Sequence, residues 1–332
     1  MKKFVKTALL FSIPFILIIS SYFILDPFKI LFKNDLSSKH PVILNRDFVS
    51  SEKYIKQHKT QDYNAFIFGS SRTVAFKTRS WTPYIGMKQR PFVFDASGET
   101  IYGIWKKVKY IKENGNKIDF ALLIFCSDVT FLEDFNSKEH LRIKHPEISK
   151  ESKAKFYFLF FKTYFSHGFF IKFLDYSIFH KKRNYMNSFL ELRDIHSDPF
   201  TNDLFIDDQE NKIIAKKEEY YFTRKDLFFT RNDTLQYYQK QITPKMRNML
   251  IEIKNIFNEL KTDYKIVLSP LYNQKKLDPE DFSLITEIFG SDNVFDYSGI
   301  NEITNSKYNY YEDSHYRYHV GRKILSEIYT DK

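Results

Sequence analysis

Two short stretches of the sequence carry the residue types of acyl-transfer chemistry. Residues 66–73 read FIFGSSRT, an apolar run that turns polar at Gly69 and then offers two serines and an arginine. Residues 312–315 read EDSH, which places two acidic residues close to His315. A serine hydroxyl is a weak nucleophile until a base removes its proton, and histidine is the usual base because its unperturbed pKa lies near neutrality. The two stretches can act together only if the fold brings them to one place.

The spacing of apolar residues predicts alternating strands and helices. Short apolar runs bounded by turn residues indicate strands, whereas apolar positions three and four apart indicate helices. The predicted strands are residues 65–69, 92–98, 118–125, 264–270 and 293–298, and the predicted helices are residues 100–114, 243–261, 278–290 and 316–329. We therefore expect an α/β fold with a five-stranded parallel sheet, which follows a polar stretch that reaches to about residue 62.

Polar residues stand where the predicted strands end. The first strand ends at Ser70 and Ser71, the second leads to Gly98, and the third is followed by Ser127 and Asp128. Ligands of open α/β sheets bind outside the carboxyl ends of the strands, so these residues are expected at one edge, together with the acid–histidine stretch. Backbone N–H groups at Ser71 and at the glycine turn would receive a developing oxyanion.

This order of blocks resembles the SGNH, or GDSL-like, hydrolases. The family's Gly-Asp-Ser block corresponds to Gly69, Ser70 and Ser71, which makes Ser71 the nucleophile. Its glycine block corresponds to Gly98, and its final block, which precedes the last helix, makes His315 the base. The resemblance therefore implies a Ser-His-acid site with no metal and no organic cofactor.

The resemblance also implies an architecture and a class of substrate. It covers about residues 60–135 and 243–330, and implies a flavodoxin-like three-layer SGNH domain over residues 60–332, interrupted by an aromatic-rich, largely helical insertion at 140–240. A membrane anchor with a Gly-Ser-Ser block looks like the cell-envelope proteins of polysaccharide O-acetylation and teichoic-acid D-alanylation. The implied function is an ester hydrolase or O-acyltransferase that acts on a cell-surface glycan, with a membrane acyltransferase as a further partner.

The third block departs from the family pattern. Where the family has an asparagine that helps to form the oxyanion hole, this sequence has Ser127 and Asp128. An aspartate carboxylate opposes an oxyanion unless it is protonated. The departure leaves an alternative open, namely a catalytically inactive SGNH-like protein that binds or assembles glycans. Arg72 fits either a contact with an acidic substrate or a salt bridge.

Two further assignments stay open at the level of sequence. The acid that orients His315 is Asp313 or Glu312; Glu312 has the family's spacing, but a two-residue offset occurs in the alginate-acetylation relatives, so Asp313 is slightly preferred. Ser70 and Ser71 also suit a turn or a helix cap, which is the usual role of such serines. The position of the serines at a predicted strand end favours the catalytic interpretation.

The N-terminus predicts a membrane anchor over residues 1–33. Residues 8–25 carry no charge, and three lysines precede them. This run matches the roughly 20 residues that a helix needs to cross a bilayer, and the leading lysines favour a cytoplasmic N-terminus with the bulk of the chain outside the membrane. A cleaved signal peptide is the first alternative, although no small-x-small cleavage site follows the run. A buried core helix is the second.

A dense aromatic block lies at residues 155–179, within the predicted insertion. Its apolar runs are too short to span a bilayer. The block suits either packing on the core or a position in the membrane interface beside the anchor, and packing is the favoured interpretation.

The overall composition excludes some classes of function. The 332 residues are 43% hydrophobic, which is enough for a large core. The net charge of +10 is spread along the chain and mixed with acids, so we expect no nucleic-acid partner. Cys126 is the one cysteine, which excludes an intrachain disulfide and a cysteine-based zinc site.

Overall fold

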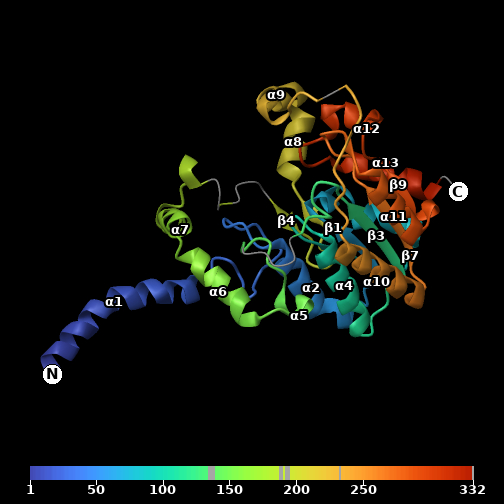
Figure 1. Cartoon of the computed structure of the whole chain (residues 1–332). Helices are drawn as coiled ribbons and strands as arrows, with labels where there is room; N and C mark the ends of the chain where they lie inside the picture. The colour runs from blue at the N-terminus through green and yellow to red at the C-terminus, as the bar shows by residue number, and fades with distance from the viewer. Residues whose placement is uncertain (134–138, 187–189, 191–194, 232, 331–332) are drawn as a thin grey trace.

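A five-stranded parallel sheet stands at the centre of the molecule (Figure 1). The computed structural model describes residues 1–133, 139–186, 190, 195–231 and 233–330. The sheet has the order β2-β1-β3-β7-β9 and consists of β1 (Ala65–Gly69), β2 (Pro91–Asp95), β3 (Phe120–Phe125), β7 (Asp263–Leu268) and β9 (Val294–Asp296). The predicted α/β fold with a five-stranded parallel sheet is confirmed.

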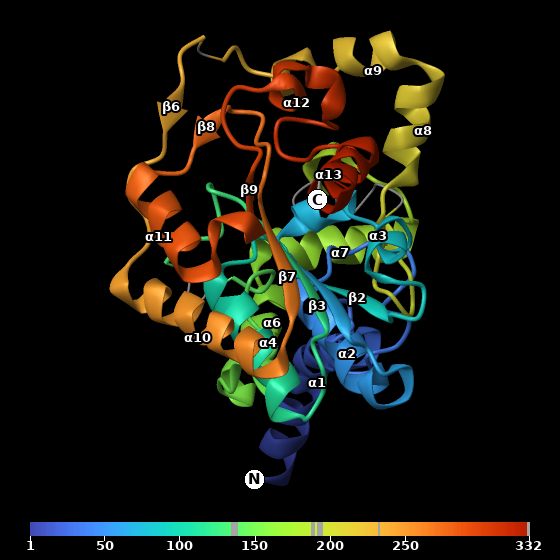
Figure 2. The same cartoon turned by 90° about the vertical axis from the view of Figure 1, so that its right-hand side faces the viewer.

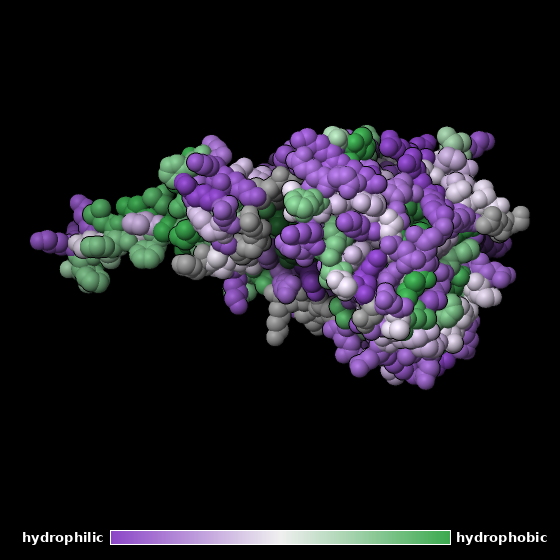
Figure 3. Space-filling model, turned by 90° about the horizontal axis from the view of Figure 1, so that it is seen from above, coloured by the Kyte–Doolittle hydropathy of each residue, from purple (hydrophilic) through white to green (hydrophobic). Residues whose placement is uncertain are grey.

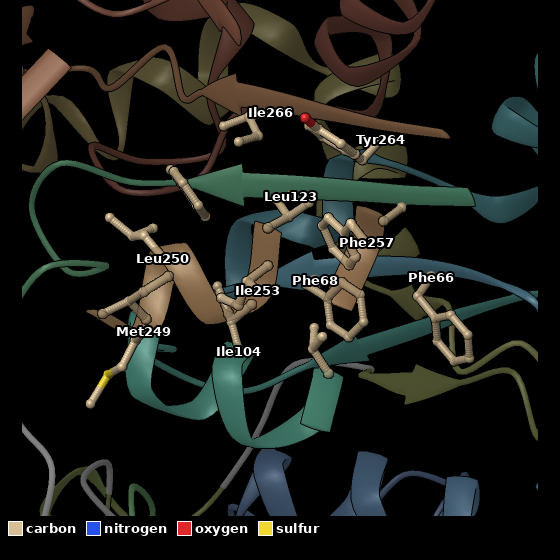
Figure 4. Close-up of a cluster of buried hydrophobic side chains, with 14 of the residues drawn as sticks. Phe66, Phe68, Ile104, Leu123, Met249, Leu250, Ile253, Phe257, Tyr264 and Ile266 are labelled. Carbon is tan, nitrogen blue, oxygen red and sulfur yellow. The ribbon is translucent and has the colours of Figure 1, made fainter. Parts of the chain in front are cut away.

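Helices cover both faces of the sheet because the strands are apolar on both sides. Phe66 and Phe68 of β1 face one hydrophobic cluster (Figure 4). Ala65 and Ile67 face another. The first cluster is covered by α2 (Arg46–Gln61), α4 (Ile101–Glu113), α10 (Pro244–Leu260) and α11 (Pro279–Phe289), and the second by α3 (Thr78–Ile85) and α13 (Tyr318–Thr330). Figure 2 shows α10 and α11 on one side of the sheet and α3 and α13 on the other.

Capping residues set the ends of the outer helices. The side chain of Thr243 accepts the backbone N–H of Met246, and Pro244 occupies the first turn of α10. Asp278 accepts two backbone N–H groups at the start of α11, which Gly290 ends with a φ of 86°. These are the residues that mark helix ends in the sequence, so both helices lie where they were predicted.

Helix α2 was not predicted, because the stretch before residue 62 is polar. Its buried residues mix charges with apolar groups: Asp47, Glu52 and Lys53 are buried beside Phe48, Val49 and Tyr54. Asp47 forms an ion pair with Lys107 of α4 at 3.1 Å, and it accepts the backbone N–H of His145 at 2.8 Å. A helix that buries paired charges shows no apolar stripe, so the usual periodic signal was missing.

The insertion contains short helices and short strands. Its elements are α5 (Pro146–Ser149), α6 (Lys153–Tyr164), α7 (His167–Phe179), β4 (His196–Ser197), β5 (Leu204–Phe205), α8 (Asp207–Ala215), α9 (Lys217–Phe222) and β6 (Gln236–Tyr237). Outside the insertion, the chain adds β8 (Lys275–Lys276), which pairs with β6, and α12 (Glu302–Asn305). The described residues also form five short 3-10 helices: η1 (Ser71–Ala75), η2 (Asn184–Met186), η3 (Lys225–Leu227), η4 (Ser291–Asn293) and η5 (Lys307–Asn309).

The aromatic block packs away from the central sheet and meets the α/β domain at α2, where Phe156 stacks on Phe48 with ring centroids 5.6 Å apart. It forms a separate cluster with the end of α1 (Lys2–Leu25) and with the residues that follow α1. The ring of Tyr22 lies 5.3 Å from that of Phe161 and 5.4 Å from that of Tyr164. Figure 1 shows α6 and α7 on the side of the molecule from which α1 extends.

Helix α1 is, within the described part of the chain, the one helix long and apolar enough to cross a membrane. Its apolar side chains are mostly exposed, so the alternative of a buried core helix is wrong. Figure 3 shows these hydrophobic residues on a projection from a mainly hydrophilic body.

The fit of α13 against η1 gives a first test. A Cβ on Gly321 would lie 2.6 Å from the backbone carbonyl carbon of Ala75. Gly321→Ala should gain about 1 kcal/mol of helix propensity, but the overlap costs about 1–3 kcal/mol, so we expect a lower melting temperature. Ser326→Ala, at an exposed position of the same helix, is the control and should not lower it. Thermal unfolding of the full chain in detergent micelles measures both; an unchanged or higher value for Gly321→Ala would contradict the close contact.

Candidate active site

The end of β1 places Ser71 at the carboxyl edge of the sheet. A Cβ at Gly69 would lie 2.8 Å from the carbonyl oxygen of Ile124 in the neighbouring strand, so a side chain there would separate the strands. The chain then turns into η1, where the side chain of Ser70 accepts the backbone N–H of Arg72. Ser70 is therefore the cap of the turn, and Ser71 is the first residue of η1.

Ser71 and His315 meet although 244 residues separate them. The Oγ of Ser71 lies 2.8 Å from the Nε2 of His315, and the Nδ1 of His315 is hydrogen-bonded to the carboxylate of Glu312. The backbone also holds the histidine, because the N–H of Tyr311 donates to the carbonyl of His315 at 2.8 Å. A serine, a histidine and a carboxylate linked in this order form the geometry of a catalytic triad.

The carboxylate that orients the ring is Glu312, so the slight preference for Asp313 does not match the structure. Asp313 makes no hydrogen bond to His315 among the contacts of the described residues. Burial and, next, the negative charge of Glu312 raise the pKa of the Asp313 carboxyl. The two candidates differ in where the loop backbone directs each side chain, which residue spacing does not reveal.

Arg72 forms a salt bridge, which is one of the two roles expected for it from the sequence. Its Nη1 and Nη2 contact the two oxygens of Asp128 at 3.0 and 2.6 Å, and its Nε donates to the carbonyl of Ser314 at 2.8 Å. The side chain thus ties η1 to the loop after β3 and to the loop that carries the histidine. The pairing also compensates the charge of Asp128, which would otherwise oppose an oxyanion.

The residues at the expected oxyanion positions are Gly98, Ser127 and Asp128. Gly98 has a φ of 60°, a left-handed conformation that suits glycine, and Ser127 is buried. Within the described residues, the backbone N–H groups of Ser71 and Gly98 donate no hydrogen bond inside the protein. Of the four residues, only Ser71 lines the pocket, so its amide is the candidate donor there, and a role for the Gly98 amide stays a prediction from the resemblance.

A buried ion pair supports the second strand end. The carboxylate of Asp95 is fully buried and contacts Arg46 at 2.9 Å. The hydroxyl of Thr73 in η1 lies 3.4 Å from the same carboxylate, and the Nζ of Lys107 donates to the carbonyl of Asp95 at 3.0 Å. Asn202, from the insertion, accepts a hydrogen bond from Arg46 at 2.8 Å through its backbone carbonyl. Five separate segments are thus joined beside Ser71.

The triad opens into a pocket of about 280 Å³. Ser71, Glu312 and His315 form one part of its wall. Nine aliphatic residues form much of the remainder: Leu36, Val42, Ile43, Leu44, Val49, Val74, Ile195, Leu204 and Ile206. Most of these residues come from the segment between α1 and α2 and from the insertion. Neither segment carries a motif, so sequence reasoning could not place either one beside the serine.

A metal site is not evident in this structure. Across the described residues, no group of three or more His, Cys, Asp or Glu side chains is arranged to hold a metal ion. That the site works without a metal or an organic cofactor stays a prediction from the resemblance.

Comparison with known proteins adds no family to this geometry. No protein-family model matches the sequence, and no curated protein matches it either. Function must then be argued from the site, because one fold supports many activities and a triad is recognised by its geometry and roles. The arrangement of Ser71, His315 and Glu312 carries that argument here.

The tie made by Arg72 can be tested through stability. Arg72→Gln should lower the free energy of unfolding by about 1–3 kcal/mol, because Asp128 and the carbonyl of Ser314 lose a charged donor. Adding Asp128→Asn should restore part of this loss, since the unpaired charge is removed. Denaturant unfolding of the full chain in micelles gives the values. Simple additivity of the two single losses would show that the residues are not coupled.

Proposed function

We propose that this protein is a serine-dependent ester hydrolase or O-acyltransferase of the cell envelope. The observation that carries the proposal is the 2.8 Å contact between Ser71 Oγ and His315 Nε2, with Glu312 on the other ring nitrogen. A purely structural role of Ser71 would not explain why a histidine, itself held by a carboxylate, contacts the hydroxyl at the wall of a pocket. The acyl acceptor, water or a sugar hydroxyl, decides between the two activities.

The mechanism follows from these contacts. Ser71 Oγ attacks the acyl carbonyl carbon while its proton moves to His315 Nε2, and Glu312 stabilises the imidazolium. The amides of Ser71 and Gly98 receive the oxyanion. Collapse expels the alcohol, which takes the proton from Nε2 and leaves an acyl ester on Ser71. A water or a sugar hydroxyl then gives its proton to Nε2 and attacks the ester, and Ser71 Oγ leaves with that proton.

The strand order supports an SGNH-like, flavodoxin-like domain. Counted within the sheet, the order is 2-1-3-4-5, and doubly wound sheets of this order bind ligands at the switch point between the first and third strands. Ser71 follows β1, at that switch point. The domain includes α2 in addition to the residues from 60 onward, because α2 contributes to the same core.

The end of α1 supports a retained membrane anchor. Tyr22 is 2% exposed within the aromatic cluster, and Ser21 Oγ lies 2.8 Å from the hydroxyl of Tyr164. A signal sequence that is cleaved away would not be expected to complete a buried cluster of the mature chain. The proposal places the bulk of the chain outside the membrane, where a cell-surface glycan is the acyl acceptor or donor and a membrane acyltransferase is a partner.

The nucleophile is tested by comparing neighbouring serines. Ser71→Ala should lower hydrolysis of a chromogenic acetyl ester about 10³-fold or more and abolish labelling by a fluorophosphonate. Ser70→Ala is the matched control, because Ser70 Oγ lies 3.4 Å from the buried Sγ of Cys126 and away from His315. Activity and labelling are followed with the full chain in nanodiscs. Absence of labelling in the unmodified protein, together with oligosaccharide binding, would favour the alternative of an inactive glycan-binding protein, which the missing asparagine motivates.

The choice of acid gives a second test. Glu312→Gln should slow fluorophosphonate labelling of Ser71 by about 10²-fold, because His315 loses the charge that stabilises its protonated form. Asp313→Asn should change the labelling rate by less than about threefold, since Asp313 does not contact the ring. Mass spectrometry of the labelled peptide over time measures both rates. The reverse ranking would return the role to Asp313.

A further inference from the structure

Aliphatic side chains form much of the wall of the pocket beside Ser71. Leu36, Ile43, Leu44 and Val49 line it, and they belong to none of the four hydrophobic clusters of the described residues. From this wall we infer that the acyl group carried by the substrate is an aliphatic chain considerably longer than acetyl. The inference rests on the proposed acyl-ester chemistry and names its substrate class.

Two polar side chains of the pocket are already engaged within the protein. Arg46 is engaged by Asp95 and by the carbonyl of Asn202. Ser197 Oγ accepts a hydrogen bond from the Nζ of Lys53 at 2.7 Å. A sugar ring requires many free donors and acceptors, and a pocket that leaves them unpaired would reject it.

Two histidines in the pocket wall also present apolar character. The ring of His196 stacks on that of Phe205, with centroids 5.2 Å apart and an interplanar angle of 14°. Burial, aided by the charge of Lys29, lowers the pKa of His40, which favours its neutral form. The neutral His40 ring adds no fixed charge to the wall, and the face of the His196 ring is covered by Phe205, as is appropriate for an alkyl chain.

The size of the pocket sets the length of the chain. An apolar cavity of about 150 Å³ holds a benzene molecule, which has six carbons. Scaled by volume, a pocket of about 280 Å³ accommodates a chain of roughly eight to twelve carbons. Each methylene that leaves water for such a wall increases binding about fourfold.

A chain-length series tests the inference in the full chain in nanodiscs. With p-nitrophenyl esters from acetyl to dodecanoyl, kcat/KM should rise up to about fourfold per methylene and reach its maximum near octanoyl or decanoyl. Ile43→Phe, which narrows the pocket, should move the maximum to shorter chains. Ile214→Phe is the matched control, because Ile214 is exposed on α8 and does not line the pocket. Its maximum should not move.

The outcomes separate this inference from the proposed function. If acetyl is the best substrate and Ser71 is still labelled, the long-chain inference fails and the nucleophile assignment stands. If no ester is hydrolysed and Ser71 is not labelled, the proposed chemistry fails. In that case, binding to the pocket is measured with the Ser71→Ala protein. Its melting temperature should rise when octanoate is added and should not rise when acetate is added. No rise with octanoate would overturn the assignment of an apolar chain site.

Discussion

The buried carboxylate of Asp95 is the constraint on which the pocket depends. It is fully buried at the end of β2, and removing the partner of such a charge costs about 3–5 kcal/mol. Arg46 supplies that partner, and Arg46 is also the first residue of α2. The ion pair therefore holds the first turn of α2 against the end of β2. The segment before α2, which forms an aliphatic wall of the pocket, is positioned by the same contact. The same carboxylate contacts η1, so the wall and Ser71 are positioned together.

A second set of contacts joins Ser71 to His315. Ser71 lies at the start of the sheet and His315 just before the last helix, and no local interaction could hold them 2.8 Å apart. Arg72 bridges the distance through the carbonyl of Ser314 and the carboxylate of Asp128. Gly321 lets α13 approach η1 closely from the other side. The pair thus rests on the packing of the domain rather than on the turn itself.

The aromatic residues act as a connection between the anchor and the domain. Tyr22 and Phe28 pack on α6, while Val42, in the same cluster, pairs with residue 190 and also lines the pocket. The cluster is consequently continuous from the end of the candidate membrane helix to the wall of the active-site pocket. This continuity explains why the block does not pack on the sheet: its partners are the residues that follow α1.

Much of the fold could be predicted from the sequence, because apolar periodicity is a local property of each strand and helix. The five strands, the capped helix after Thr243 and the apolar N-terminal helix were all identified in this way, as was the candidate pair of Ser71 and His315. Only the tertiary structure decided that Glu312 contacts the ring, that Arg72 binds Asp128, and that α2 buries charged side chains. These features depend on partners from distant segments. The sequence alone does not show whether a charged side chain will face water or pair with a buried counter-charge.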